Sequence, residues 1–150
     1  MATQVISKTY HYRNELGWRF RRLGSVVSEG KHPLQVSSPP EFKGETGNWT
    51  PEDLFVASAN ACLLLTFLAY VEKEHIAVSS YESAAVGTVE RVAEEYRFTE
   101  ITIQPRVTLM DSSYAPQVEE MLRKAEENCL IANSIMAHVH VEPQILSVAD

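Results

Sequence analysis

The feature that most constrains this sequence is a single long helix predicted to begin just after Thr50. Thr50 is a favourable N-cap, Pro51 suits the first helical position, and acidic residues follow in the first turn, where they complement the helix dipole. The pattern predicts a helix from residue 51 to about 73 or 74, more than about 30 Å long at roughly 1.5 Å per residue. It is apolar nearly all round over residues 54–71, so we expect both faces to be buried. A small domain cannot easily cover such a helix alone, and we infer that a second subunit covers part of it.

The apolar run is interpreted as a buried helix and not as a membrane span. It contains Ser58, Asn60 and Thr66, and acidic residues flank it on both sides. Residues 1–9 lack the basic-then-apolar pattern of a signal peptide, so the expected location is the cytosol. The net charge of −7 argues against binding to nucleic acid or to an anionic membrane surface, because both recruit clustered Lys and Arg.

The other elements predict an α+β fold with mostly antiparallel strand pairing, in one domain over residues 1–150. We expect four short strands before the long helix, then two longer strands joined by a tight turn at Glu94 and Glu95, a second helix and a final strand. This order differs from the alternating strands and helices of a parallel sheet. The expected strands cover residues 4–12, 18–22, 25–28, 34–37, 83–93, 98–109 and 138–148, and the second helix runs from about 116 to 136.

Two cysteines are the first candidates for chemistry. Cys62 lies in the middle of the long helix and Cys129 lies late in the second helix. In a cytosolic protein, two such cysteines are more often free, catalytic or redox-active than a structural disulfide, although a buried cysteine is often only a small hydrophobic residue. Their spacing does not resemble a zinc site. His138 and His140 share a face of the last strand, but no third ligand is evident, so we expect no metal.

A reactive Cys62 needs a cation, because the thiolate is the nucleophile and apolar surroundings disfavour it. An arginine fits, since its charge is permanent and its planar group can bond a thiolate and a carboxylate together. The candidates are Arg19, Arg21 and Arg22 for the cation, and Glu52 and Asp53 for the carboxylate that orients it.

Helix geometry limits how Glu52 and Cys62 can meet. They are ten positions apart, which separates them by roughly 15 Å along a helix axis and places them on different faces. Either the helix breaks between them, or the site combines two chains whose long helices cross antiparallel.

Two stretches of the sequence resemble a known family. Residues 50–62, TPEDLFVASANAC, resemble the central-helix motif of the OsmC/Ohr hydroperoxide reductases, and residues 125–135, AEENCLIANSI, resemble the second-cysteine motif of that family. The order of elements matches along nearly the whole chain. The resemblance therefore predicts the OsmC-like fold, with mostly antiparallel sheets packed on long central helices in an intertwined homodimer.

The resemblance also implies roles for individual residues. Cys62 matches the cysteine that attacks the peroxide and becomes a sulfenic acid, and Cys129 matches the cysteine that then forms a disulfide with it. Glu52 matches the glutamate that holds an arginine over the thiolate, and Arg22, followed by Leu23 and Gly24, fits the arginine best, with Arg19 and Arg21 as alternatives. The implied substrate is an organic hydroperoxide, and the implied reductant is an external dithiol, of the lipoyl type in the Ohr branch. No cofactor is implied.

Some features depart from the family pattern or leave alternatives open. The family usually carries a proline directly after the second cysteine, where this chain has Leu130, which leaves the chain freer to stay helical. The loop before Thr50 is shorter and poorer in glycine than in the Ohr branch. Trp49 and Phe55 flank the helix start and are candidates to line an apolar substrate pocket. The alternatives to a peroxidase are a small-molecule binder or redox sensor on the same fold, and a structural dimer with two inert thiols.

Overall fold

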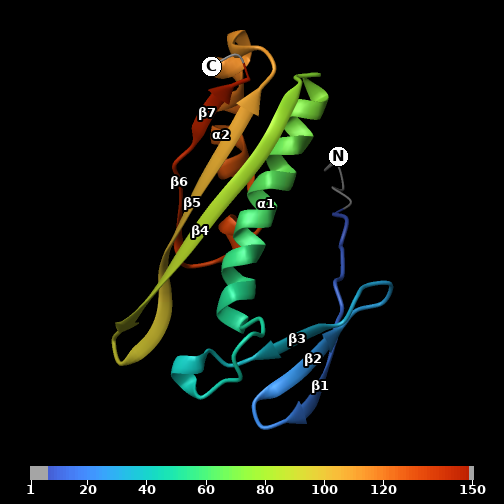
Figure 1. The fold of residues 1–150 in the computed structure, drawn as a ribbon, viewed down its shortest axis with the longest axis vertical. Coiled ribbons are helices and arrows are strands. Elements are labelled where there is room, and N and C mark those ends of the chain that lie inside the picture. Colours follow the sequence, from blue (N-terminus) through green and yellow to red (C-terminus); the bar gives the residue numbers. More distant parts are fainter. Residues whose placement is uncertain (1–6, 149–150) are drawn as a thin grey trace, which may run out of the picture. The chain divides into compact units, whose positions relative to one another are not determined.

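The computed structural model describes residues 7–148 (Figure 1). The chain forms two compact units, with the boundary between residues 52 and 53. The first unit is a small sheet with a loop, and the second contains the helices and the larger sheet. The predicted α+β fold class is confirmed. The prediction of one domain over residues 1–150 stays a prediction.

The first unit is built on an antiparallel sheet in the order β1-β2-β3. Its strands are β1 (Glu15–Phe20), β2 (Leu23–Val27) and β3 (Leu34–Ser37). Arg21, with a φ of 44°, forms with Arg22 the turn between β1 and β2, so the predicted strand over 18–22 ends earlier than expected. After β3 the chain makes a 3-10 turn (Pro40–Phe42) and returns to the sheet, where the Ser37 N–H donates to the Trp49 carbonyl (2.9 Å).

The second unit packs two helices on one sheet. The helices are α1 (Pro51–Lys73), which starts at the boundary between the units, and α2 (Ala115–Asn128). The strands β4 (Val78–Val92) and β5 (Glu95–Leu109) form a long antiparallel hairpin, and β6 (His138–Val141) and β7 (Gln144–Ser147) both pair with β5 in parallel. Two further 3-10 turns, Ser112–Tyr114 and Ala132–Ser134, precede and follow α2.

The core of this unit lies between the helices and one face of the sheet. Alternate residues of β5 are buried, as the period of a half-covered strand requires, while the residues between them, such as Gln104 and Arg106, are exposed. One face of each helix meets this surface. The buried core residues from these elements are Ala59, Leu63, Phe67 and Val71 of α1, Ile101, Ile103, Val107 and Leu109 of β5, and Val118, Met121, Leu122 and Ala125 of α2.

The predicted first helix is confirmed at both ends. It begins at Pro51, and it ends at Lys73 because His75 takes a left-handed conformation (φ 55°). The N–H of Ile76 donates to the Val71 carbonyl (3.0 Å) and the N–H of His75 to the Glu72 carbonyl (3.2 Å), the hydrogen-bond pair of a Schellman cap.

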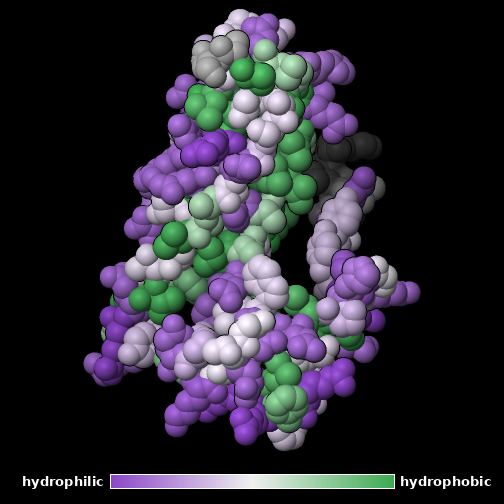
Figure 2. Space-filling view, in the orientation of Figure 1, coloured by the Kyte–Doolittle hydropathy of each residue, from purple (hydrophilic) through white to green (hydrophobic). Residues whose placement is uncertain are grey.

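Only one face of α1 is buried within the single chain. Leu65 is 65% exposed and Leu68 is also exposed, and Figure 2 shows apolar side chains gathered along α1. The second face is exposed in one copy, and its burial by a second subunit stays a prediction. By length and composition alone α1 could cross a membrane, but its buried face forms part of the core described above.

Three further expected elements differ from the structure. The strand expected over 4–12 lies partly outside the described residues, and residues 7–12 form no strand, since no neighbouring strand pairs with them. The last strand is divided at Glu142 and Pro143, because proline has no N–H to give to the ladder. The hairpin turn lies at Ala93 and Glu94, both with positive φ, one residue before the expected place.

The connection through α2 was not predicted. Because β6 runs parallel to β5, the elements β5, α2 and β6 form one βαβ crossover. Strand β7 also pairs with β5 in parallel, whereas β4 and β5 pair antiparallel. The second helix also ends at Asn128 and not near residue 136. The early end of α2 determines the geometry around both cysteines.

Candidate active site

The fold brings the two cysteines together. Cys62 lies half-buried in the middle of α1, and Cys129 is the residue at which α2 stops; both are free thiols. The thiol of Cys129 is hydrogen-bonded to the Cys62 sulfur. Two residues that are far apart in the sequence thus share one site in the second unit, as the prediction required.

The turn that follows α2 shapes this site. Cys129 has an extended backbone (φ −68°, ψ 111°), so the helix cannot continue through it. The Asn133 side chain donates to the Glu127 carbonyl (2.9 Å), and its N–H donates to the Cys129 carbonyl (3.0 Å). Leu130 leaves the chain freer to stay helical than proline would, yet the helix ends before it, so the predicted helix end near residue 136 is wrong. The side chain of Asn133 instead bonds the Glu127 carbonyl, which a continuing helix would use.

Several contacts favour the thiolate of Cys62. Burial raises the pKa of this thiol, but hydrogen bonds outweigh burial and the pKa lies below the ordinary value. The donors are the backbone N–H groups of Ile131 and Leu130, the Cys129 thiol and the Thr66 hydroxyl. The last contact is long, at 4.0 Å between Cys62 Sγ and Thr66 Oγ1.

Cys129 has the opposite character. It is only 2% exposed, and burial raises its pKa to about 11, with a further rise from the neighbouring Cys62. Hydrogen bonds from the backbone N–H groups of Ala132 and Ile131 offset part of this effect. As pH rises, Cys62 therefore loses its proton before Cys129 does, which suits an attacking thiolate beside a protonated partner.

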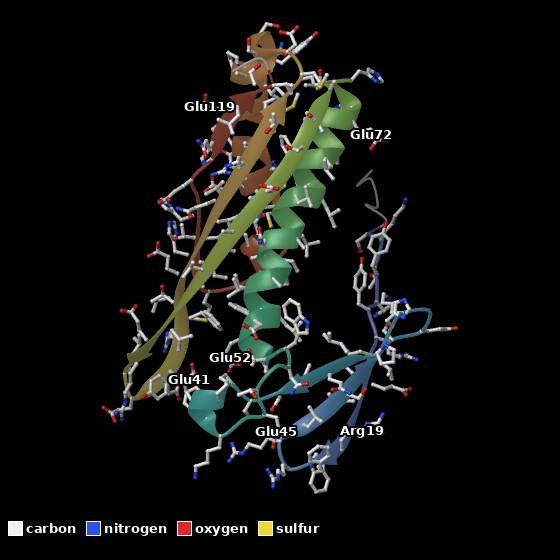
Figure 3. The ribbon with its side chains drawn as sticks, viewed as in Figure 1. Arg19, Glu41, Glu45, Glu52, Glu72 and Glu119 are labelled. Atoms are coloured by element: carbon white, nitrogen blue, oxygen red, sulfur yellow. The ribbon has the colours of Figure 1, made fainter. Side chains whose placement is uncertain are left out.

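Glu52 does not join Cys62 within one chain. Helix α1 is continuous from Pro51 to Lys73, so the alternative of a break between the two residues is excluded. Figure 3 shows Glu52 at the first turn of α1. Its Oε2 atom is buried and has no hydrogen-bond partner among residues 7–148. A buried carboxylate oxygen without a donor is costly.

The three arginines lie in or beside the first hairpin of the first unit. Arg22 Nη1 donates to the Phe42 carbonyl (3.1 Å), and Arg21 forms an exposed ion pair with Glu45 (3.6 Å), a kind of contact that contributes little. Arg19 lies on β1 (Figure 3). The prediction that Arg22, or else Arg19 or Arg21, lies over the Cys62 thiolate stays a prediction.

The remaining candidates have structural contacts. Phe55 stacks on Phe98, with ring centroids 4.6 Å apart, and packs against the core, while Trp49 is 49% exposed. Their part in a substrate pocket stays a prediction. The rings of His138 and His140 lie 5.6 Å apart on exposed positions, and among residues 7–148 no cluster of His, Cys, Asp or Glu could hold a metal.

Sequence reasoning did not find the backbone donors to Cys62. The N–H groups of Leu130 and Ile131 become available only because α2 stops at Asn128, and this stop depends on a side chain several residues further along. The signal that could have found it is the pair Asn128 and Asn133, since asparagine favours helix ends over helix interiors.

Comparison with known proteins agrees with this architecture. A family model described as OsmC-like protein matches residues 43–144. The uncharacterized protein YmaD of Bacillus subtilis is 22% identical over 138 residues, which cover 89% of this chain and 91% of YmaD. An OsmC-like protein of unknown function from Vibrio cholerae is 25% identical, with a TM-score of 0.83 over 90% of this chain and 99% of its own. An organic hydroperoxide resistance protein from Legionella pneumophila is 22% identical, with a TM-score of 0.70 over 92% of this chain and 99% of its own.

Proposed function

This chain belongs to the OsmC-like protein family, and from that premise we propose that it is a thiol-dependent peroxidase that reduces organic hydroperoxides to alcohols. Solved proteins of similar fold include organic hydroperoxide resistance proteins from Legionella pneumophila and Elizabethkingia anophelis. The observation that carries the proposal is the contact between Cys62 and Cys129, whose pKa values are moved in opposite directions.

In the first step the Cys62 thiolate attacks the outer peroxide oxygen. The sulfur–oxygen bond forms as the oxygen–oxygen bond breaks, and the alkoxide leaves as the alcohol after taking a proton. Cys62 is then a sulfenic acid, oxidised by two electrons, and the peroxide is reduced by two. A thiol with a lowered pKa is suited to this attack because more of it is ionised at neutral pH.

In the second step Cys129 resolves the sulfenic acid. Its sulfur attacks the Cys62 sulfur, the disulfide forms, and the hydroxyl leaves as water with the proton of Cys129. The hydrogen bond between the two thiols in the reduced state supports a short path to this bond. An external dithiol, of the lipoyl type or another, then reduces the disulfide through a mixed disulfide and is itself oxidised to a cyclic or linear disulfide.

The active form that we propose is a homodimer. The exposed apolar face of α1 and the unpaired Oε2 of Glu52 support a site completed by a second copy. In this proposal Glu52 of one copy orients Arg22 over Cys62 of the other. The exposed Leu65 and Leu130, which flank the cysteines in sequence, support a preference for apolar organic peroxides over hydrogen peroxide.

The test is a peroxide-consumption assay with cumene hydroperoxide and dihydrolipoamide, comparing the wild type with Cys62→Ser. We expect sustained turnover in the wild type and only the uncatalysed rate in the variant. If the wild type shows no turnover with dihydrolipoamide and none with dithiothreitol, the peroxidase proposal fails, and a binder or redox sensor on the same fold becomes the better account.

A further inference from the structure

Helix α1 by itself offers Cys62 little help in carrying a charge. The helix is continuous around Cys62, so its backbone N–H groups are used within the helix ladder. The one side-chain contact from the same helix is the 4.0 Å contact with Thr66 Oγ1, which lies at the limit for a sulfur hydrogen bond. Leu63 beside it is fully buried in the apolar core, which disfavours a thiolate.

The turn after α2 supplies what α1 lacks. Because Cys129 is extended, the N–H groups of Leu130 and Ile131 are released from the helix pattern, and both donate to the Cys62 sulfur. The titratable group that contacts this sulfur within the second unit is the Cys129 thiol. Hydrogen bonds from fixed backbone groups to a charged atom are stronger than neutral ones and need no rearrangement as the charge forms.

Side chains further along hold this turn in place. Asn133 bridges it, with its side chain on the Glu127 carbonyl (2.9 Å) and its N–H on the Cys129 carbonyl (3.0 Å). Ser134 closes it from the other side, donating its hydroxyl to the Leu130 carbonyl (2.7 Å). The N–H of Leu130 belongs to the same peptide group as the Cys129 carbonyl, and the N–H of Ile131 to the same group as the Leu130 carbonyl. Both peptide groups are therefore held in place by the bonds to these carbonyls.

We propose that the turn over residues 129–134 is an activating element of the peroxidatic site, in which the N–H groups of Leu130 and Ile131 hold the Cys62 thiolate and Asn133 is the positioning residue. The proposal rests on the proposed function. It assigns to the chain that carries Cys62 a stabilisation of the thiolate that is separate from any arginine of a second copy.

This geometry explains an effect of having leucine, and not proline, at position 130. A proline at this position, which the family pattern favours, has no N–H, so it could not make the bond that Leu130 makes to Cys62. The backbone here tolerates proline well. Cys129 is already extended, as a residue before proline prefers, and residue 130 is the first of a helical turn closed by Asn133, where proline is favoured. Leu130→Pro should therefore remove one hydrogen bond and little else.

The first experiment compares Leu130→Pro with Leu130→Ala, both in a Cys129→Ala background so that only Cys62 reacts. The probe is iodoacetamide, and the measurement is the rate of alkylation of the folded protein as a function of pH. We expect Leu130→Pro to lower the rate at neutral pH by about tenfold, the effect of one lost bond to a charged group. Leu130→Ala keeps the N–H and should stay within about twofold of the parent, on the same scale. Equal profiles for the two variants would overturn the role of the Leu130 N–H.

The second experiment compares Asn133→Ala with Asn128→Ala as a matched control. Asn128 also donates its side chain to a carbonyl of α2, that of Lys124 (2.8 Å), but it does not close the turn. Both variants lose a similar bond and should lose similar thermal stability. We expect Cys62 alkylation at neutral pH to slow several-fold in Asn133→Ala alone. Equal slowing in both variants, or in neither, would overturn the positioning role of Asn133.

These outcomes are separable from a failure of the proposed function. Alkylation by iodoacetamide requires no peroxide and no reductant. If the alkylation profiles follow the expectation while the wild type fails to consume cumene hydroperoxide, the turn still activates Cys62 and only the peroxidase activity is refuted. If Leu130→Pro does not fold by circular dichroism, the comparison of the two asparagine variants alone decides the proposal.

Discussion

The two cysteines are carried by regions built in opposite ways. Around Cys62 the chain is a continuous helix, fixed by apolar packing of one face against the sheet. Around Cys129 the helix has stopped, and the chain is held by polar bonds from Asn133 and Ser134 to main-chain carbonyls. The first region positions the Cys62 thiol but gives it few hydrogen-bond donors, and the second region provides donors because its backbone is irregular.

This difference shows why one site needs both regions. A continuous helix satisfies its own N–H groups and leaves none for a side chain in its middle. A helix that ends releases such groups, and here they meet a sulfur on the other helix. Packing and polar contacts thus make separate contributions, one to stability and position, the other to reactivity, and substitutions should separate them.

The largest effect is expected from the cysteines themselves. Cys129→Ser should reduce about one equivalent of cumene hydroperoxide per site and then stop, because Cys62 reaches the sulfenic acid with no thiol beside it to form the disulfide. Rapid-quench kinetics with limiting dihydrolipoamide measures this burst. Steady turnover at the wild-type rate in Cys129→Ser would show that the second region takes no part in the cycle.

The next largest effect is the selectivity of alkylation between the two thiols. The lowered pKa of Cys62 and the raised pKa of Cys129, about 11, predict that Cys62 is ionised first as pH rises, while Cys129 stays protonated until pH approaches 11. Near pH 8 we expect Cys62 to react at least about a hundred times faster with iodoacetamide. Peptide mapping by mass spectrometry after substoichiometric labelling measures the ratio, and equal labelling would contradict the assigned polarity of the pair.

A third prediction tests the packed region alone. A Cβ on Gly87 of β4 would lie 2.5 Å from Val56 Cγ2 and 2.7 Å from Phe98 Cε1, so Gly87→Ala must push α1 or the ring away. We expect the free energy of unfolding in urea to fall by about 1–3 kcal/mol, with little change in Cys62 alkylation. Gly17→Ala is the control, because nothing lies within 4 Å of its added Cβ. A large loss of Cys62 reactivity in folded Gly87→Ala would mean that packing and reactivity are not separable.

The smallest effect is expected from Thr66. Its hydroxyl lies 4.0 Å from the Cys62 sulfur, on the same helix and one turn further along. Thr66→Val keeps the shape and removes the hydroxyl, and we expect it to change Cys62 alkylation at neutral pH by less than about threefold, since so long a contact is weak. An effect as large as that of Leu130→Pro would mean that α1, and not the turn after α2, supplies the main hydrogen-bond donor to Cys62.

The same contrast decides how much could be predicted from the sequence. Helix α1 was predicted to its last residue, because its signals are local: an N-cap, a proline at the first position and an unbroken apolar pattern. The end of α2 was misplaced, because the amide that stops it belongs to Asn133, beyond the residue at which the helix ends. The division of the last strand could have been predicted from Pro143, which has no N–H for the ladder.

The site was predicted in part for the same reason. The two cysteines were found from their types and from the motifs around them, and the structure places them in contact. The N–H groups of Leu130 and Ile131 carry no side-chain signal, since every residue except proline has such a group and only the course of the backbone makes it available. Glu52 and the arginines lie in the first unit, and the prediction that they meet Cys62 in a homodimer stays a prediction.

The most direct test of this account is the product of a single turnover. Reduced wild-type protein is treated with one equivalent of cumene hydroperoxide, quenched in acid, and digested for peptide mapping by mass spectrometry without reduction. The account predicts an intramolecular disulfide between Cys62 and Cys129 as the main product. Recovery of Cys62 as sulfinic acid with Cys129 still a free thiol would contradict it, because the contact between the two thiols would then have no part in the chemistry.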